Sequence, residues 1–587
     1  MKKPRGGWVI FLVAPVLLAA YSMTWAPGAW WGDGLELAAA AKVLGVPHPT
    51  GYPLYILLGH AAIESFGFID PGQLLTIMSA LFCSLAASQV GLAVASVRSS
   101  IDHVESPGEQ PPAIGNLHST PWLMGAGAAF IFGVSRTVWE HATFAEVYPL
   151  TWLLGAAILL LVCARPVKNL APRTVLLGSL CGLATLNHYS ILALAPLAVC
   201  AVFSWGKEAK RSSSLVLLFV LGFGVWPFGY GLVLLRASAN PEINWGDPST
   251  LQRLLWMLRG GDYIALNAPN GFAEIFDGGR YWLEWLGRQF LPAELHPIAF
   301  MPVGLVLYAG AISGCWSLAK RRRSLAIGLL AIFFVTFLFA VLYPIPDRDA
   351  YLVPALPAVI LGWLQLARLG KLGTAESLDP KRPQVATILV SLGAAIGLIV
   401  GNGRSIDKSG DNGPKLWAGH VLQGLPPDAL VLTRQAHDSE IYALWYEQIV
   451  NGTRPDVTVF GTGFIFSGWY RKYFEVEGRP KIQLFITDRE PGSKEIYDIA
   501  LVGGVIAPNA GKRRIFMTAG EPDEMDPTIR QLNPVPFAEL LPKEYYDHTA
   551  YKLNPPGRIL VELKPDENLL RIAKERFRET FDQEPPS

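Results

Sequence analysis

Charged residues are scarce in this 587-residue chain. Asp, Glu, Lys and Arg make up 17% of it, below the roughly 25% of a typical soluble protein. The two signs nearly cancel, with 49 Lys and Arg against 48 Asp and Glu, so net charge gives no case for nucleic-acid binding. Cysteine is scarce too: the 5 cysteines lie in or beside apolar runs without a CxxC pair, so neither a disulfide framework nor a zinc site is indicated.

Several catalytic motifs are also missing. The sequence has no Walker loop, dinucleotide fingerprint, HExxH motif or recognisable Ser-His-Asp arrangement. Hydrophobic residues, in contrast, make up 51% of the chain, and the mean hydropathy is +0.31. Because about 20 mostly apolar residues cross a bilayer, the sequence predicts a polytopic α-helical membrane protein with about eleven transmembrane helices. These segments begin near Trp8, Leu74, Trp122, Val147, Val175, Ser190, Leu215, Ile298, Leu325, Tyr351 and Val385.

Two stretches have alternative interpretations. The first apolar run follows basic residues, as in a signal peptide, but it continues into Trp30 and Trp31, which suit a membrane interface, so we interpret it as a retained helix. The apolar stretch from Tyr52 to Phe68 would add a span, but it would place the basic residues 320–323 outside the cell. We interpret it as a re-entrant or interfacial segment. The sequence thus predicts a multi-pass protein of the inner or plasma membrane.

The composition becomes polar after the last predicted span. Short apolar strands are expected at 429–433 and 456–460, with a helix at 438–450 between them. Such a β-α-β unit is typical of an α/β domain. We therefore predict a membrane-embedded module over residues 1–402 and a soluble α/β domain over residues 403–587. With the N-terminus in the cytoplasm, an odd number of spans puts this domain outside it.

Polar side chains form four groups beside the outer ends of the predicted spans, where charge is costly and commonly marks a functional cavity. In the first group, Asp33 and Glu36 share one face if a helix begins at Asp33, and His48 and Tyr52 follow in a loop rich in Gly and Pro. Helix capping by Asp33, a dipole contact of Glu36 and a turn role for His48 explain the same pattern.

The other three groups also have simpler alternatives. They consist of Arg136, Glu140, His141 and Glu146; of His188; and of Asp347, Arg348 and Asp349. Arg136 and Glu140 could form an i,i+4 ion pair, His188 could be a packing residue, and the third run could be a local salt bridge. Carboxylates beside a membrane nevertheless suit a general base, while Arg and His suit a lipid phosphate.

These residues are part of a longer pattern. It comprises Gly32-Asp33 with Glu36, residues 44–53 (LGVPHPTGYP), Ser135-Arg136 with Trp139, Glu146-Val-Tyr148, Gly182 with His188, residues 347–354 (DRDAYLVP), residues 444–446 (LWY) and residues 454–457 (RPDV). The pattern resembles a bacterial family of multi-spanning proteins, long of unknown function. The eukaryotic relatives of that family are endoplasmic-reticulum protein O-mannosyltransferases that act on plexin-type immunoglobulin-like domains.

The resemblance implies a GT-C glycosyltransferase fold, a polyprenyl-phosphate sugar as donor and a catalytic Asp in the first external loop. Asp33 would then be the base, and Glu36 would orient the acceptor or Asp33. Candidates to hold the departing lipid phosphate are Arg136, His188 and Arg348. Further active-site candidates are His48, Tyr52, Glu140, His141, Glu146, Asp347 and Asp349. Phosphate leaves readily when cationic donors meet it, so we require no metal ion and no cofactor.

The chain departs from the family pattern at two places. The family has Gly-Asp-Ser-Gly-Glu where this chain has residues 32–36 (GDGLE), which keeps both acids, and Thr50 replaces a proline. The predicted function is inverting transfer of a sugar, with mannose as a candidate, to an extracytoplasmic acceptor, with a protein Ser/Thr hydroxyl as a candidate. Expected partners are the lipid-linked donor, a protein or glycan acceptor and membrane lipids, without nucleic acid.

Three alternatives to this function stay open. One is a GT-C enzyme that modifies lipid or polysaccharide. Another is a transporter of lipid-linked or small-molecule substrate, although the sequence shows neither an internal repeat nor paired interrupted helices. The last is a sensor whose external domain binds a ligand, although four polar groups exceed what a passive anchor needs.

Overall fold

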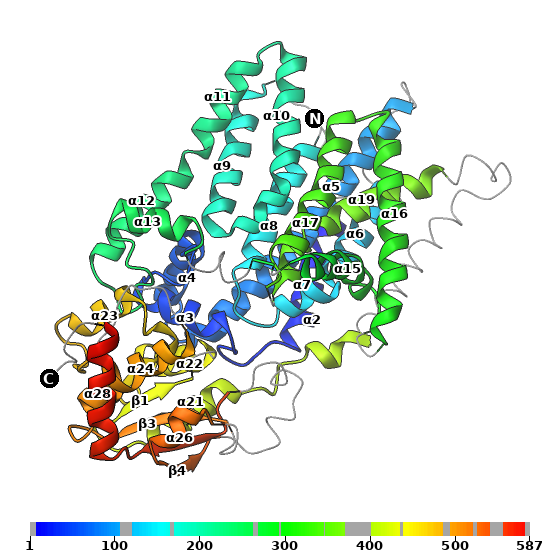
Figure 1. Ribbon diagram of the computed structural model, residues 1–587. Coiled ribbons are helices and arrows are strands. Elements are labelled where there is room, and N and C mark those ends of the chain that lie inside the picture. Colours follow the sequence, from blue (N-terminus) through cyan, green and yellow to red (C-terminus); the bar gives the residue numbers. More distant parts are fainter. Residues whose placement is uncertain are drawn as a thin grey trace.

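The computed structural model describes residues 8–105, 120–164, 169–261, 268–269, 271–292, 295–345, 347–369, 401–434, 438–484, 493–520, 525–540 and 556–581. In these ranges, long helices form a bundle, and a smaller domain that contains a β-sheet lies at one end of it (Figure 1). The helix predicted to begin near Val385 lies outside the described residues. The architecture is that of a helical membrane protein with a C-terminal sheet domain.

The bundle contains the predicted apolar segments. Its helices are α1 (Trp8–Phe11), α2 (Val13–Ser22), α5 (Pro71–Glu105), α6 (Thr120–Gly133), α8 (Tyr148–Cys163), α9 (Ala171–Asn187), η1 (Tyr189–Leu194), α10 (Ala195–Ala209), α11 (Ser212–Phe223), α12 (Val225–Ser238), α16 (Phe300–Ala319), α17 (Arg323–Leu342), α18 (Arg348–Leu352) and α19 (Ala355–Leu369). In the described part of the chain, 5 helical segments are long and apolar enough to cross a membrane by length and composition. The multi-pass character is therefore confirmed, whereas the total number of spans stays a prediction.

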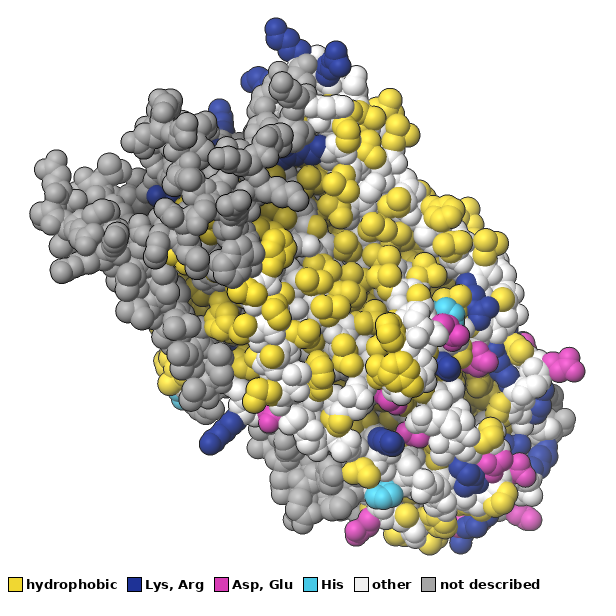
Figure 2. Space-filling model, turned by 180° about the vertical axis from the view of Figure 1, so that it is seen from behind, with side chains coloured by type: hydrophobic (Ala, Val, Ile, Leu, Met, Phe, Trp, Pro, Cys, Tyr) yellow, Lys and Arg dark blue, Asp and Glu magenta, His cyan; other side chains and the backbone are white. Residues whose placement is uncertain are grey.

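Glycine allows α5 and α6 to approach each other closely. A Cβ atom on Gly91 would stand 2.5 Å from the carbonyl oxygen of Gly125, and one on Gly125 would stand 2.6 Å from that of Gly91. Small residues at such a crossing let membrane helices pack backbone against backbone. Elsewhere, apolar side chains cover the outside of the bundle and form a broad area in Figure 2.

Shorter helices connect these long ones. They are α3 (Asp33–Val43), α4 (Pro53–Ser65), α7 (Arg136–His141), α13 (Leu251–Leu258), α15 (Phe272–Arg288) and η2 (Pro297–Ala299). Helix α4 has 13 residues, fewer than the roughly 20 that cross a bilayer, and it packs against α3, α5, α9 and α12. Its length agrees with the re-entrant or interfacial segment predicted from Tyr52 to Phe68.

The C-terminal domain is built around a 5-stranded sheet in the order β2-β1-β3-β5-β4. The strands are β1 (Leu430–Thr433), β2 (Thr458–Gly461), β3 (Ile515–Ala519), β4 (Pro534–Glu539) and β5 (Ile559–Leu563). The helices are α21 (Gly413–Gly424), α22 (Asp438–Ile449), η4 (Thr462–Phe464), α23 (Gly468–Glu475), α24 (Lys494–Leu501), η5 (Val502–Ile506), α25 (Ala507–Asn509), α26 (Pro527–Gln531) and α28 (Glu567–Phe581). Strands β1 and β2 are parallel and flank α22, as the predicted β-α-β unit requires, whereas β5 runs antiparallel to β3 and β4.

The C-terminal domain packs on the helix that begins at Asp33. Helix α22 contacts α3, and the Tyr446 hydroxyl of α22 donates to Asp70 Oδ2 at 2.8 Å while it accepts the N–H of Gly72 at 3.1 Å. The ring of Trp31 meets Trp417 of α21 edge-on, with centroids 6.0 Å apart. The segment around Asp33 therefore lies between the bundle and the sheet domain.

Candidate active site

Helix α3 presents its two carboxylates differently. Gly32 is the N-cap and has a φ of +87°, which glycine adopts without strain, so helix capping does not account for Asp33, the first helical residue. The Asp33 side chain is 40% exposed, whereas Glu36, about one helical turn further on, is fully buried. Of these two carboxylates, only that of Asp33 is open to a substrate.

Glu36 binds His48. One of its oxygens accepts the backbone N–H of His48 at 3.0 Å, and the other lies 2.5 Å from His48 Nδ1. His48 itself is 7% exposed. A buried carboxylate needs hydrogen-bond partners, and this loop supplies two. The loop that follows α3 therefore folds back over the first turn of that helix.

The opposite nitrogen of His48 faces Tyr52 and Asp33. His48 Nε2 lies 2.8 Å from Tyr52 Oη and 3.6 Å from Asp33 Oδ2. Burial alone would lower the pKa of His48, but the Asp33 and Glu36 carboxylates raise it to about 10, so the ring is an imidazolium at neutral pH. Burial raises the pKa of Asp33, and the charge of His48 opposes that rise. An accessible carboxylate with a raised pKa suits general base catalysis.

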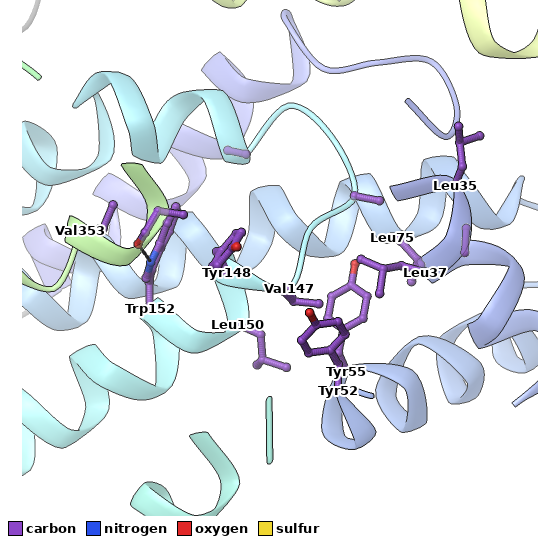
Figure 3. Packing of buried hydrophobic residues seen from close by; sticks show 14 of the residues in the cluster. Leu35, Leu37, Tyr52, Tyr55, Leu75, Val147, Tyr148, Leu150, Trp152 and Val353 are labelled. Atoms are coloured by element: carbon purple, nitrogen blue, oxygen red, sulfur yellow. Dashed lines mark hydrogen bonds between the residues drawn. The ribbon is translucent and has the colours of Figure 1, made fainter. Parts of the chain in front are cut away.

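Aromatic side chains connect Tyr52 to the third and fourth groups. The Tyr52 ring stacks on His188 with centroids 5.7 Å apart, and Tyr148 meets His188 edge-on at 4.7 Å. The Tyr148 hydroxyl donates to Asp347, and the hydroxyl of Tyr351 lies 3.3 Å from His188 Nε2. Figure 3 shows Tyr52 beside α4 and Tyr148 on α8 among the packed side chains of one buried cluster. The structure thus brings His48, His188 and Asp347 into one connected site.

His188 is neutral in this setting. Burial and then the charge of His48 lower its pKa to about 3. Its Nδ1 accepts the backbone N–H of Ser190 at 3.1 Å, which leaves the ring proton on Nε2, the nitrogen that faces Tyr351. His188 can therefore offer an N–H donor to a phosphate but no positive charge.

Glu146 and Asp347 add carboxyl groups near Asp33. Glu146 is 5% exposed and accepts the backbone N–H of Val147 at 2.7 Å. Burial and then the negative charge of Asp33 raise the pKa of Glu146. Burial also raises the pKa of Asp347, and the hydrogen bond from Tyr148 opposes that rise. Carboxyl groups this close together disfavour each other's ionisation, so the site holds fewer negative charges than acids.

Arg136 and Glu140 form a neighbouring group with Asp349. They make no ion pair with each other within the described residues, so the i,i+4 alternative is not realised. Burial and then the charge of Glu140 raise the pKa of Asp349 to about 7, and Arg136 opposes that rise. Lys408 approaches the same group: burial lowers the pKa of its ammonium, and the negative charge of Glu140 opposes that decrease.

His141 and the Lys408 side chain connect this group to the Asp33 loop. The ammonium of Lys408 lies 4.6 Å from the centroid of Trp30 and 5.2 Å from that of Phe144. Phe144 meets His141 at 5.5 Å, and His141 meets Tyr148 at the same centroid distance. Since Trp30 lies three residues before Asp33, both ends of this row of side chains reach the site.

The run Asp347-Arg348-Asp349 does not stay together. Asp347 binds Tyr148, Asp349 faces Glu140, and the Arg348 guanidinium lies 3.4 Å from the ring centroid of Tyr281 in α15. The local salt bridge considered for this run is therefore not formed. A cation–π contact holds the Arg348 guanidinium against α15, and its expected role in binding the donor phosphate stays a prediction.

Several residues of the site were not predicted. Tyr351 and Tyr148 lie within four residues of predicted site residues, so polar and aromatic side chains at these helix ends were the available signal. Lys408 follows the last predicted span, and Trp245, whose ring lies 6.1 Å from that of His48, belongs to a distant loop. Nothing near either residue in the sequence indicates its position.

An apolar hollow lies beside the polar residues. Trp152 and Val353 line it, together with Phe132, Ile191, Leu329 and Pro357. The Trp152 ring stacks on Tyr148, which binds Asp347, so the hollow begins next to the acidic site. Among the described residues, no group of three His, Cys, Asp or Glu side chains could hold a metal ion. Independence from a metal ion stays a prediction.

Comparisons with known proteins show which chains are similar to this one. Residues 33–212 match the family described as the protein O-mannosyl-transferase TMEM260 N-terminal domain. The protein O-mannosyl-transferase TMEM260 of Mus musculus is 25% identical over 492 residues, which cover 79% of this chain and 64% of the relative. The Dictyostelium discoideum protein of that name is 23% identical over 500 residues, which cover 77% and 56%. This chain thus spans less than two thirds of the length of these relatives.

Solved structures are similar over nearly the whole chain. ArnT from Cupriavidus metallidurans matches in the apo state with a TM-score of 0.54, at 14% identity, over 95% of this chain and 98% of ArnT. Its structure bound to undecaprenyl phosphate matches with a TM-score of 0.52. The chain is therefore a polytopic membrane protein with the GT-C fold. Within that class it is related to the TMEM260 protein O-mannosyl-transferases, which confirms the resemblance drawn from the sequence.

Proposed function

We propose that this protein is a membrane glycosyltransferase that moves a sugar from a polyprenyl-phosphate donor to an extracytoplasmic hydroxyl. The names of its relatives support mannose as the sugar and a protein hydroxyl as the acceptor. The ArnT complex with undecaprenyl phosphate supports the class of donor. Transfer to a lipid or polysaccharide is the alternative within the same enzyme class.

The contrast between Asp33 and Glu36 carries this proposal. Asp33 is 40% exposed and lies 3.6 Å from His48, which is close enough for an ion pair. Among the described residues, no hydrogen bond occupies its carboxylate. Glu36 is fully buried and has both oxygens on His48. Asp33 is therefore the residue assigned to the acceptor, and Glu36 acts on it through His48.

In the proposed reaction, Asp33 is the general base. It takes the proton of the acceptor hydroxyl while the oxygen attacks the anomeric carbon. The bond from that carbon to the phosphate oxygen breaks, and polyprenyl phosphate leaves with the electron pair. Attack from the side opposite the phosphate inverts the anomeric carbon. General base catalysis of this kind contributes about 10²- to 10⁴-fold to the rate.

Arg136 and His188 are the groups we assign to the departing phosphate. Arg136 supplies positive charge and a fork of N–H donors, and His188 supplies one N–H donor because it is neutral. Donors that are fixed before the reaction stabilise developing negative charge most effectively. The apolar hollow beside Trp152 and Val353 suits the first isoprene units of the carrier.

The distribution of charge supports an extracytoplasmic site. The turn between α16 and α17 carries residues 320–323 (KRRR), and it lies at the end of the bundle away from the C-terminal domain (Figure 1). Figure 2 shows Lys and Arg side chains but no Asp or Glu at that end, whereas side chains of both signs are present at the end with the C-terminal domain. By the positive-inside rule, this distribution supports a location of the C-terminal domain and Asp33 outside the cytoplasm. A phosphatase fused after Pro414 should be active and one fused at Ser324 inactive.

The function is tested with the purified protein and radiolabelled polyprenyl-phosphate sugars in the presence of host membranes. We expect label from the mannose donor to enter protein with the wild type and not with Asp33→Asn. Label in lipid or polysaccharide instead would replace the proposed acceptor. No transfer from any donor, with donor binding intact, would refute the enzymatic function.

A further inference from the structure

Trp245 lies between the His48 loop and the C-terminal domain. The N–H of Val46 donates to the carbonyl of Ile243 at 2.7 Å, and the N–H of Trp245 donates to the carbonyl of Val46 at 2.9 Å. Gly45 permits this parallel approach, because a Cβ atom there would stand 2.6 Å from the Ile243 carbonyl oxygen. Two backbone hydrogen bonds therefore hold the segment 243–245 against Val46, which precedes His48 by two residues.

The ring of Trp245 touches both parts of the molecule. On one side it meets His48 edge-on, with centroids 6.1 Å apart. On the other it stacks on Trp469 of α23 at 5.0 Å and meets Phe464 of η4 edge-on at 4.8 Å. Trp245 is only 6% exposed, so these rings enclose it. A shift of α23 would therefore be transmitted to His48 through close-packed rings.

An ion-pair group attaches the same segment to α23. Asp247, which is 2% exposed, pairs with Lys472 at 2.9 Å and also with Arg253 of α13. Lys472 follows Trp469 by three residues, so both side chains lie on one face of α23. Helix α23 thus binds the segment 245–247 through the stacking of Trp469 on Trp245 and through the ion pair of Lys472 with Asp247.

We propose that Trp245 is a positioning residue through which the C-terminal domain sets the orientation of His48. His48 in turn places positive charge beside Asp33, so the domain contributes to turnover as well as to any binding of acceptor. This inference rests on the proposed function of Asp33. A domain that only bound the acceptor would not need to pack α23 against Trp245, whereas a domain that orients His48 does.

Two tryptophans of the C-terminal domain provide matched variants. Trp469→Ala removes the stacking partner of Trp245. Trp445→Ala removes an equally large ring from the same aromatic cluster, but Trp445 contacts Tyr442, Phe464 and Tyr470 rather than Trp245. Trp245→Phe is the conservative variant, since it keeps an aromatic ring beside His48.

The first measurement is the pH dependence of kcat at saturating donor. We expect Trp469→Ala to lower kcat about tenfold, as a misplaced catalytic group does, and Trp445→Ala to leave it near the wild-type value. Because the charge of His48 opposes the rise in the pKa of Asp33, a displaced His48 should move the acid limb of the profile to higher pH. Trp245→Phe should give a profile between those of the wild type and Trp469→Ala. Equal profiles for Trp469→Ala and Trp445→Ala would overturn the inference.

The second measurement does not depend on activity. Diethyl pyrocarbonate modifies neutral, accessible imidazoles, and mass spectrometry can follow it at His48 with His60 as an internal reference. We expect His48 to react slowly in the wild type and in Trp445→Ala, and several-fold faster in Trp469→Ala. Unchanged labelling of His48 in Trp469→Ala would refute the positioning role even if no transferase activity were found. Faster labelling without any transferase activity would support it and count against the proposed function alone.

Discussion

The His48 loop and the run Asp347-Arg348-Asp349 both carry several polar side chains beside the helix ends, but they use them differently. In the first region, His48 contacts Glu36 with one ring nitrogen and lies near Asp33 with the other. In the second, three consecutive residues face three different elements. The difference teaches that closeness in the sequence does not create a site. A loop that folds back on its own helix creates a site, because it turns the side chains of the loop and of the helix toward a common point.

The largest expected effect concerns Asp33 in the first region. Asp33→Asn keeps the size and a hydrogen-bonding oxygen but loses the basicity, so turnover at saturating donor should fall about a hundredfold or more. Expression, thermal stability and donor binding should stay near the wild type. If most of the turnover is retained, Asp33 is not the base, and the first region is a structural cluster.

Glu36→Gln should cost less than Asp33→Asn. The amide can still accept the backbone N–H of His48, but it no longer pairs with the imidazolium. The loss of one charged hydrogen bond corresponds to a decrease in turnover of about thirtyfold. Kinetics at saturating donor measure it, and Glu36→Asp serves as the charge-conserving control. A loss as large as that of Asp33→Asn would mean that Glu36 takes part in the proton transfer itself.

Arg136 and Arg348 are compared as candidates to bind the donor phosphate, because only Arg348 belongs to the second region. Arg136→Ala should raise the KM for the lipid-phosphate sugar about tenfold, because a charge-assisted contact to phosphate is lost, and Arg136→Lys should restore part of it. Arg348→Ala should leave this KM near the wild-type value, since the guanidinium lies on Tyr281. An equal increase in both alanine variants would place Arg348 at the phosphate after all.

The smallest expected effect is on the pH dependence of stability. The carboxylates raise the pKa of His48 from an ordinary value of 6.5 to about 10. A group with a raised pKa in the folded state stabilises fully below its unfolded pKa, and this contribution is lost as pH rises through the folded pKa. The difference in thermal midpoint between wild type and His48→Asn should therefore be largest at and below about pH 6.5 and should shrink as the pH rises through about 10. A constant difference over that range would show that His48 is not held as an imidazolium.

Much of the fold could be predicted from the sequence. Apolar runs identify the helices because an unpaired backbone cannot cross a bilayer, and the change in composition after the last span indicates the C-terminal domain. The cost of charge near hydrocarbon also identified Asp33, Glu36, His48 and His188 as candidates before their contacts were known.

The remaining features depend on contacts between distant parts of the chain. Spacing places Asp33 and Glu36 on one side of α3, but it does not reveal that His48 covers only Glu36. Trp245 reaches His48 through a backbone pairing between loops, and Lys408 reaches Trp30 from beyond the last predicted span. Such pairings follow from the packing of the whole bundle, so a local pattern contains no signal for them.

The most direct test of the account is the stereochemistry of one turnover. Purified full-length protein would transfer radiolabelled mannose from a polyprenyl-phosphate donor of known anomeric configuration, and the configuration of the product linkage would be determined. If Asp33 is the base of a single displacement, the wild type forms a product of inverted configuration and Asp33→Asn forms none above background. A product that retains the configuration of the donor would contradict the account, because retention requires two displacements and a nucleophile in place of a base.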